Sequence, residues 1–161
     1  MLTLESRVSV DGLTAQEVTD FLLDPSDQSY QAWWPGTHHA FHVLRHATGE
    51  DHVGDVVRMD EHVGSRRVRM DAEVVQAVPG EKIVWLVRRW RIRLPIRVSL
   101  VLQNQEHGVL LRHAITVGWS GRGAVFDPLW RLYFSESFAA AMDQHAHTEF
   151  GLLRDLLHPA R

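Results

Sequence analysis

The stretch RVRMDAEV, residues 67–74, decides the fold class because its charged and apolar side chains alternate without a break. Side chains on a β-strand point to opposite faces in turn, so this pattern predicts a strand with one wet face and one dry face. Such strands are typical of an antiparallel sheet that is covered on one side only. The predicted outer set is Arg67, Arg69, Asp71 and Glu73, and the predicted inner set is Val68, Met70, Ala72 and Val74.

The stretch RRWRIRL, residues 88–94, repeats the pattern and predicts a second strand of the same kind. Trp90, Ile92 and Leu94 form its apolar set, and the same alternation turns Arg88 inward. The arginines invite a nucleic-acid interpretation, but they alternate along a strand and the net charge is −3. A solvated sheet face explains them better, so we predict no nucleic-acid partner.

Strands extend from this region in both directions. Between His38 and Trp119 the text is a series of strands separated by Gly-containing turns, and residues 2–10 alternate as a first strand. After that first strand, Thr14 and Glu17 have the spacing of a capping box, which predicts the start of a helix. A second short helix is predicted to carry Trp33 and Trp34 and to stop at Pro35-Gly36.

A long amphipathic helix is predicted to close the chain. Phe126-Asp127-Pro128 resembles a helix start, and nothing before Pro159 breaks the pattern except Gly151, a tolerated loss of about 1 kcal/mol. Its apolar stripe runs through Trp130, Phe134, Phe138, Ala141, His145, Glu149, Leu152 and Leu156.

These elements predict an α+β fold in which a curved antiparallel β-sheet grips a long C-terminal α-helix. The 161 residues suit one domain, 1–161, with a single core. Curvature leaves space between sheet and helix, where an internal hydrophobic cavity is expected.

Composition limits the chemistry and the setting. The chain has no cysteine, which excludes disulfides, thiolate nucleophiles and cysteine-ligated metals. The N-terminus does not resemble a signal peptide, and no stretch has the roughly 20 apolar residues of a membrane helix. We therefore expect a cytoplasmic protein without stable membrane insertion.

The order of elements resembles the START-like (SRPBCC, helix-grip) superfamily, in particular its polyketide cyclase/dehydrase and lipid-transport group. The resemblance covers essentially the whole chain and depends on the order of short motifs. They are Ala15-Gln-Glu-Val18 with Phe21-Leu-Leu-Asp-Pro25, Trp33-Trp34-Pro35-Gly36, Gly54-Asp55-Val56-Val57, Ala77-Val78-Pro79-Gly80-Glu81-Lys82, and the segment His145–Leu153. The resemblance implies the fold and a hydrophobic ligand cavity. It does not imply a reaction, because one fold hosts many functions.

The histidines of AWWPGTHHAFHVLRH, residues 32–46, raise the question of a metal site. His38, His42 and His46 are four residues apart, which would suit one ion only on a helix. The Pro35-Gly36 break and the alternation that follows favour a strand, where these three are too far apart for one ion. The sequence has no HExxH motif, so we predict no metal and no cofactor.

Polar residues on predicted dry faces are the candidates for function. Alternation turns Arg88, His113 and Glu61 inward, and His145, with Glu149 as a further candidate, lies on the stripe of the last helix. A buried charge needs a partner, so Arg88 is predicted to pair with Glu61 or Glu149. Either these groups reach solvent or form a structural network, or they converge on a pocket. In the pocket interpretation, His113 and His145 are candidate acids or bases and Arg88 a candidate oxyanion clamp.

Three functions remain open from sequence. The first is binding of a small hydrophobic or aromatic ligand, lipid-like or polyketide-like, between sheet and helix. The second is an enzyme of the polyketide cyclase, aromatase or dehydratase type, and the third is a partner-binding role, with homodimerisation left open. The predicted ligand-binding residues are Trp34, Met59, Glu61, Met70, Arg88, Trp90, His113, Phe134, Phe138 and His145.

Overall fold

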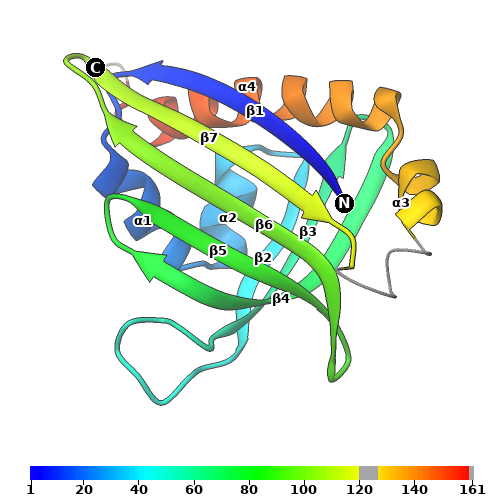
Figure 1. The fold of residues 1–161 in the computed structure, drawn as a ribbon. Helices are drawn as coiled ribbons and strands as arrows, with labels where there is room; N and C mark the ends of the chain where they lie inside the picture. The colour runs from blue at the N-terminus through cyan, green and yellow to red at the C-terminus, as the bar shows by residue number, and fades with distance from the viewer. Residues whose placement is uncertain (120–126, 160–161) are drawn as a thin grey trace.

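The computed structural model describes residues 1–119 and 127–159, which form seven strands and four helices (Figure 1). In chain order these elements are β1 Leu2–Asp11, α1 Ala15–Leu23, α2 Asp27–Trp33, β2 His38–Arg45, β3 Val56–Val63, β4 Arg66–Val78, β5 Lys82–Arg89, β6 Ile92–Asn104, β7 Gly108–Val117, α3 Asp127–Tyr133 and α4 Glu136–Leu157.

The strands form one antiparallel sheet with the order β1-β7-β6-β5-β4-β3-β2. Strands β2 to β7 follow one another as a meander, and β1 returns to pair with β7 along its whole length, from Leu2 opposite Val117 to Asp11 opposite Gly108. The predicted α+β class and the antiparallel sheet are therefore confirmed.

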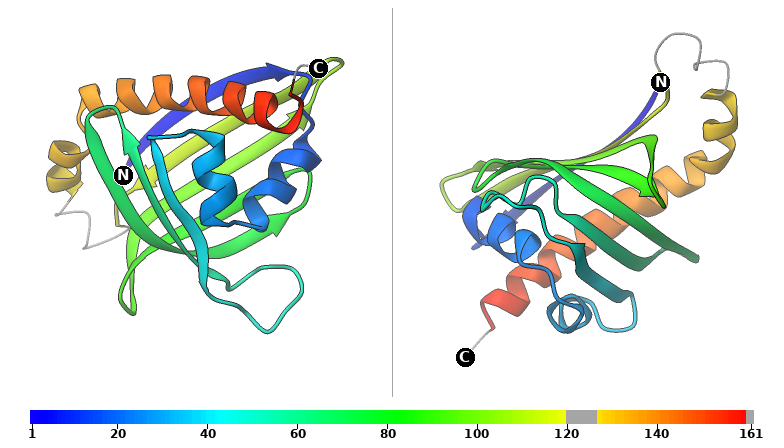
Figure 2. Two further views of the ribbon diagram at one scale, coloured as in Figure 1. Left: turned by 180° about the vertical axis from the view of Figure 1, so that it is seen from behind. Right: turned by 90° about the horizontal axis from the view of Figure 1, so that it is seen from below.

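The sheet is bent, and the helices cover one of its faces. Irregular registers interrupt the pairing of β2 with β3, β4 with β5, and β5 with β6. Such bulges bend strands and increase their twist. Figure 2 shows the result: α4 crosses the sheet on its inner side, and α1 and α2 cover the same face beside it.

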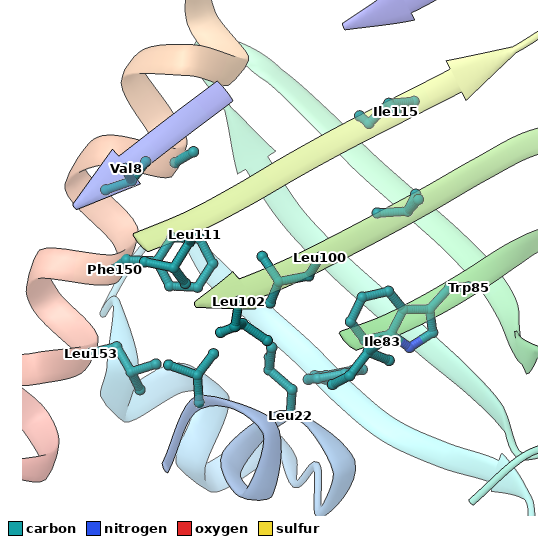
Figure 3. Close-up of a cluster of buried hydrophobic side chains, with 14 of the residues drawn as sticks. Val8, Leu22, Ile83, Trp85, Leu100, Leu102, Leu111, Ile115, Phe150 and Leu153 are labelled. Carbon is teal, nitrogen blue, oxygen red and sulfur yellow. The ribbon is translucent and has the colours of Figure 1, made fainter. Parts of the chain in front are cut away.

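One end of the space between the layers is filled by a hydrophobic core (Figure 3). Leu100, Leu111 and Leu153 are at most 1% exposed, and they bring β6, β7 and α4 together. Burying side chains of this size contributes roughly 1.5–3 kcal/mol each before chain entropy is subtracted. The indole of Trp33 also donates a hydrogen bond of 2.6 Å to the backbone oxygen of Glu149, which ties α2 to α4.

Local signals at the first helix act as expected. The Thr14 side chain accepts a hydrogen bond from the Glu17 backbone, and the Glu17 carboxylate accepts one from the Thr14 backbone. This is the predicted capping box, and it satisfies amide groups that a helix start otherwise leaves free.

The C-terminal helix differs from the prediction because it is two helices. Ser135 lies outside both, and its hydroxyl accepts a hydrogen bond from the Phe138 amide, so α4 has its own N-cap. Helix α3 begins at Asp127, while Phe126 of the predicted start lies outside the described residues. Among the helices of residues 1–119 and 127–159, none is both long and apolar enough to span a membrane.

A second correction concerns residues 88–94, which do not form one strand. Arg89 at the end of β5 pairs with Ile92 at the start of β6, so Trp90 and Arg91 form a two-residue hairpin turn. Trp90 has a φ of 58° and is 87% exposed, and Ile92 is 65% exposed. Tight hairpin turns require positive φ and normally use Gly or Asn, and because neither residue stands here, this turn was not predicted.

Candidate functional site

A cavity of about 760 Å³ lies between the inner face of the sheet and α4. Its walls are mainly apolar and include Met59, Val98, Ile115, Phe134 and Phe138. Its volume falls within the range of small-molecule sites, roughly 300–1,000 Å³. The exposed side chains of Trp90 and Tyr133 also line it, which places its opening near the β5–β6 turn and α3.

Nine of the ten residues predicted to bind ligand line this cavity. Trp34 is the exception among them. It caps the end of α2, and its ring lies 4.7 Å from the ring of His145, outside the cavity wall. The neighbouring Trp33, which is 2% exposed, lines the cavity instead.

Arg88 does not have the predicted partner. It lies directly opposite Asp71, and its Nη1 donates a hydrogen bond of 2.8 Å to Glu73, rather than to Glu61 or Glu149. The turn at Trp90 explains the error, because alternation counted through a turn gives the wrong face. Ile83, Val84, Trp85 and Val87 are the buried apolar residues of β5. Arg88 follows Val87, so its backbone position belongs to the other face, although its side chain still borders the cavity while Nη1 binds Glu73.

His113 lies on the buried face of β7, opposite Leu100, as predicted. Burial, opposed by the charge of Glu61 and aided by that of His145, lowers the pKa of its imidazole to about 4. His113 is therefore neutral at pH 7. The hydrogen bonds found within residues 1–119 and 127–159 include none to its ring, so the ring is available to a cavity ligand.

Four ionisable side chains from two layers meet at the inner end of the cavity. His38 on β2 lies directly opposite Glu61 on β3, and both are buried. His145 and Glu149 are one helical turn apart on α4 and point toward this pair. One ligand-type atom from each of the four lies within 4.8 Å of the others. We call these four residues the inner cluster.

Tyr30 of α2 contacts both strand residues of the inner cluster, His38 and Glu61, and holds them in place. Its hydroxyl donates a hydrogen bond of 2.5 Å to Glu61, and its ring stacks on the imidazole of His38 at 3.9 Å. The Nδ1 atom of His38 lies 3.2 Å from the Tyr30 backbone oxygen. A carbonyl oxygen can only accept, so Nδ1 of His38 bears the proton and Nε2 has a free lone pair.

The inner cluster perturbs its own protonation. Burial raises the pKa of Glu149 to about 8, with help from the charge of Glu61 and against that of His145. Burial also opposes ionisation of Glu61, but His145 and Tyr30 outweigh it and its pKa is lowered. For His145, burial opposes the charge, yet the two carboxylates outweigh it and its pKa is raised. Burial lowers the pKa of His38 to about 4.

The inner cluster as a unit was not predicted from the sequence. Alternation and helix spacing place Glu61, His145 and Glu149 inward, but His38 had been compared only with other histidines of its own strand. The structure agrees that those are separate: His42 lies 2.8 Å from Asp27, and the His46 side chain is 78% exposed. One signal was available, since the spacing of His145 and Glu149 puts two ligand-type groups on one helix face.

No protein-family model matches the chain, and no curated protein matches its sequence. Solved structures do match its fold. The di-domain ARO/CYC BexL from the BE-7585A biosynthetic pathway has a TM-score of 0.58 and 14% identity over 99% of this chain and 52% of that one. Major latex-like protein 151 from Panax ginseng has a TM-score of 0.54 and 16% identity over 90% and 98%. The Aha1 dimer from Colwellia psychrerythraea has a TM-score of 0.51 and 14% identity over 94% and 98%.

The chain therefore has the same fold as these solved structures, and its described residues form a seven-stranded sheet and a long helix. At these identities the likeness concerns the fold.

Proposed function

We propose that this protein binds a small hydrophobic or aromatic molecule, lipid-like or polyketide-like, that has one polar group. The observation that supports this most is the cavity of about 760 Å³, which combines apolar walls with ionisable groups at its inner end. An apolar body would displace water from the walls, at about 25 cal/mol for each Å² of apolar surface buried.

The polar group of the ligand would meet two histidines whose pKa values are shifted in opposite directions. Neutral His113 offers one ring N–H and one acceptor nitrogen, whereas His145 has a raised pKa and favours its charged, donor-only form. A carbonyl, hydroxyl or carboxylate suits this wall better than a cation. Among the described residues, Glu61 and Glu149 at this wall both lie next to His145, so neither carboxylate is free to bind a cation.

Binding can be measured with a naphthalene sulfonate dye whose fluorescence rises in apolar sites. The variant Val98→Phe adds a ring inside the cavity, because Val98 is 6% exposed and lines its wall. We expect the dye affinity to fall at least tenfold. The control Val101→Phe makes the same change on the opposite face of β6, and there the affinity should not change. Equal affinities in the two variants would contradict the proposal.

An enzyme that catalyses proton transfer to or from a carbonyl compound is a second candidate. It is favoured by His145, a histidine with a raised pKa that lines the cavity next to Glu61. Arg88 stays a candidate oxyanion clamp, because it lines the cavity and its Nε has no hydrogen-bond partner, although its Nη1 donates to Glu73. A charged His145 would polarise the carbonyl, and neutral His113 would accept the α-proton.

This step can be tested with an aryl β-keto ester in D₂O, where NMR follows exchange at the acidic carbon in the presence of EDTA. The enzyme hypothesis expects catalysed exchange that falls at least about a hundredfold in His113→Gln and in His145→Gln. The exposed histidine variant His46→Gln is the control. No exchange above background would leave binding as the function and reject this one.

A further inference from the structure

We propose that His38, Glu61, His145 and Glu149 form a binding site for one divalent transition-metal ion of the zinc class. This inference goes beyond the proposed function and does not depend on it. The sequence predicted no metal, and the inference comes from the packing of β2, β3 and α4.

The distances within the inner cluster are those of ligands around an ion, rather than of hydrogen bonds. The imidazole Nε2 of His145 lies 3.4 Å from Glu61 and 3.6 Å from Glu149. The Nε2 of His38 lies 3.6 Å from Glu61 and 3.8 Å from Glu149. Hydrogen bonds from nitrogen to oxygen are shorter, about 2.7–3.2 Å. Nitrogen and oxygen ligands about 2.1 Å from a tetrahedral zinc lie about 3.4 Å apart.

Two buried nitrogen atoms that face the centre of the cluster have no hydrogen-bond partner. They are Nε2 of His38 and Nε2 of His145, whose side chains are 0% and 4% exposed. A buried polar atom without a partner destabilises the fold, so such atoms are rare and point to a missing partner. A metal ion at the centre would satisfy both at once.

Contacts around the cluster orient its ligands as they do in metal sites. The Nδ1 of His38 donates to the Tyr30 carbonyl, which leaves Nε2 as the ligating atom. The Tyr30 hydroxyl binds the Glu61 carboxylate, and the ring of Trp34 packs against His145. Outer contacts of this kind fix ring orientation and tune affinity.

The ligand types define the class of ion. Two imidazoles and two carboxylates balance the charge of a divalent ion, and imidazole favours zinc and its transition-metal neighbours over magnesium or calcium. Glu61, His145 and Glu149 also line the cavity. A bound ion would therefore be within reach of an oxygen atom on a cavity ligand.

The first test is zinc binding by the whole protein after treatment with EDTA and removal of the chelator. A titration in competition with a chromophoric zinc chelator should show one Zn²⁺ per chain. His38→Gln and Glu149→Gln should each lower the zinc affinity at least tenfold. Circular dichroism of each variant checks that the fold is retained.

The neighbouring residue provides a matched control. His39 follows His38 but points to the other side of β2, where its Nε2 lies 2.7 Å from the Nδ1 of His62. This pair is an alternative place for zinc to attach. His39→Gln should leave the affinity unchanged if the inner cluster is the site. A loss in His39→Gln with no loss in His38→Gln would overturn the proposal.

A second measurement uses Co²⁺ in place of zinc and does not depend on a variant that might fail to fold. Four-coordinate Co²⁺ absorbs visible light far more strongly than the hydrated ion. We expect this strong absorption in the wild-type protein, and its loss when equimolar Zn²⁺ is added. A spectrum equal to that of hydrated Co²⁺, or the absence of tight zinc binding, would also overturn the proposal.

Discussion

The inner cluster and the opposite face of the same sheet both bring carboxylates next to basic groups, but they do so in different ways. On the opposite face, Glu73 accepts hydrogen bonds of 2.8 Å from both Arg88 and Arg93. In the inner cluster the corresponding distances are 3.4–3.8 Å, and two histidine nitrogens have no partner. In the first arrangement the carboxylate is held at hydrogen-bond distance by two arginines, although the Nε of Arg88 has no partner, whereas the second has room for another atom between its groups.

Contact distances therefore separate structural charges from functional ones. The planar guanidinium group of arginine matches a carboxylate in geometry and stays charged at all relevant pH values. The network of Glu73, Arg88 and Arg93, here called the outer network, therefore stabilises the sheet. Buried histidines and carboxylates that lie too far apart to hydrogen-bond to one another reduce the stability of the fold unless something binds between them. The comparison predicts opposite responses when one carboxylate is removed from each group.

The largest effect is expected for Glu73→Ala. This change leaves Arg88, whose side chain is 17% exposed, without its partner. Breaking a largely buried pair should lower the free energy of unfolding by about 4 kcal/mol, measured by urea denaturation at pH 7. In Arg93→Gln the lost partner is 60% exposed, so the loss should stay below about 1 kcal/mol. Similar losses in the two variants would contradict this account.

Acid should act on the cavity side and leave the outer network intact. Burial lowers the pKa of His113 to about 4, while the unfolded chain keeps the ordinary value of 6.5. The unfolded state therefore binds a proton first, and stability present above pH 6.5 is lost as the pH falls toward 4. The loss due to His113 should reach about 3 kcal/mol at pH 4. The difference in unfolding free energy between wild type and His113→Leu should change with pH only below about 6.5.

Tyr30→Phe should have a smaller effect, and on the inner cluster alone. It removes the hydroxyl that holds Glu61 but keeps the ring that stacks on His38. We expect zinc affinity to fall about tenfold, or about 1.4 kcal/mol, as for other outer contacts of metal ligands. The same chelator competition measures it. An unchanged affinity would show that Glu61 needs no support from Tyr30.

The smallest effect, of opposite sign to that of Glu73→Ala, is expected for Glu149→Gln in EDTA. Burial and Glu61 raise the pKa of Glu149 to about 8, so its carboxyl is held neutral at pH 7 against its tendency to ionise in the unfolded chain. Glutamine is neutral without this penalty. The free energy of unfolding should therefore rise or stay unchanged. A loss of more than about 2 kcal/mol would instead assign Glu149 to the structural group.

Much of the fold could be predicted from local patterns. Alternation in β4 and β7 reported the buried face correctly, because the pleat imposes a period of two wherever a strand is regular. The prediction failed at Trp90, where a turn without Gly or Asn reverses the phase, and with it the assignment of Arg88. The prediction of a single C-terminal helix also failed, because Ser135 caps α4 and separates it from α3 in a sequence that otherwise favours one continuous helix.

The stripe predicted along the last helix was only approximate for a related reason. Steps of four residues advance 400°, so a run such as 134, 138, 145 and 149 drifts around the helix. The buried residues of α4 are Phe138, Met142, His145, Ala146, Phe150 and Leu153, and of these only Phe138 and His145 belong to the predicted stripe. The position of Glu149 next to His145 was predictable from helix geometry, but what faced them was not.

Local sequence patterns were sufficient to predict the α+β class, the antiparallel sheet, the capping of α1 and the inward direction of Glu61, His113 and His145. Each of these depends on neighbours within a few residues, where backbone geometry alone sets the period. The contacts of His38 with Glu61, His145 and Glu149, and of Arg88 with Glu73, follow instead from tertiary packing. Those contacts join residues from up to 111 positions apart in the case of His38 and Glu149, and they depend on sheet register and on the place where α4 crosses the sheet.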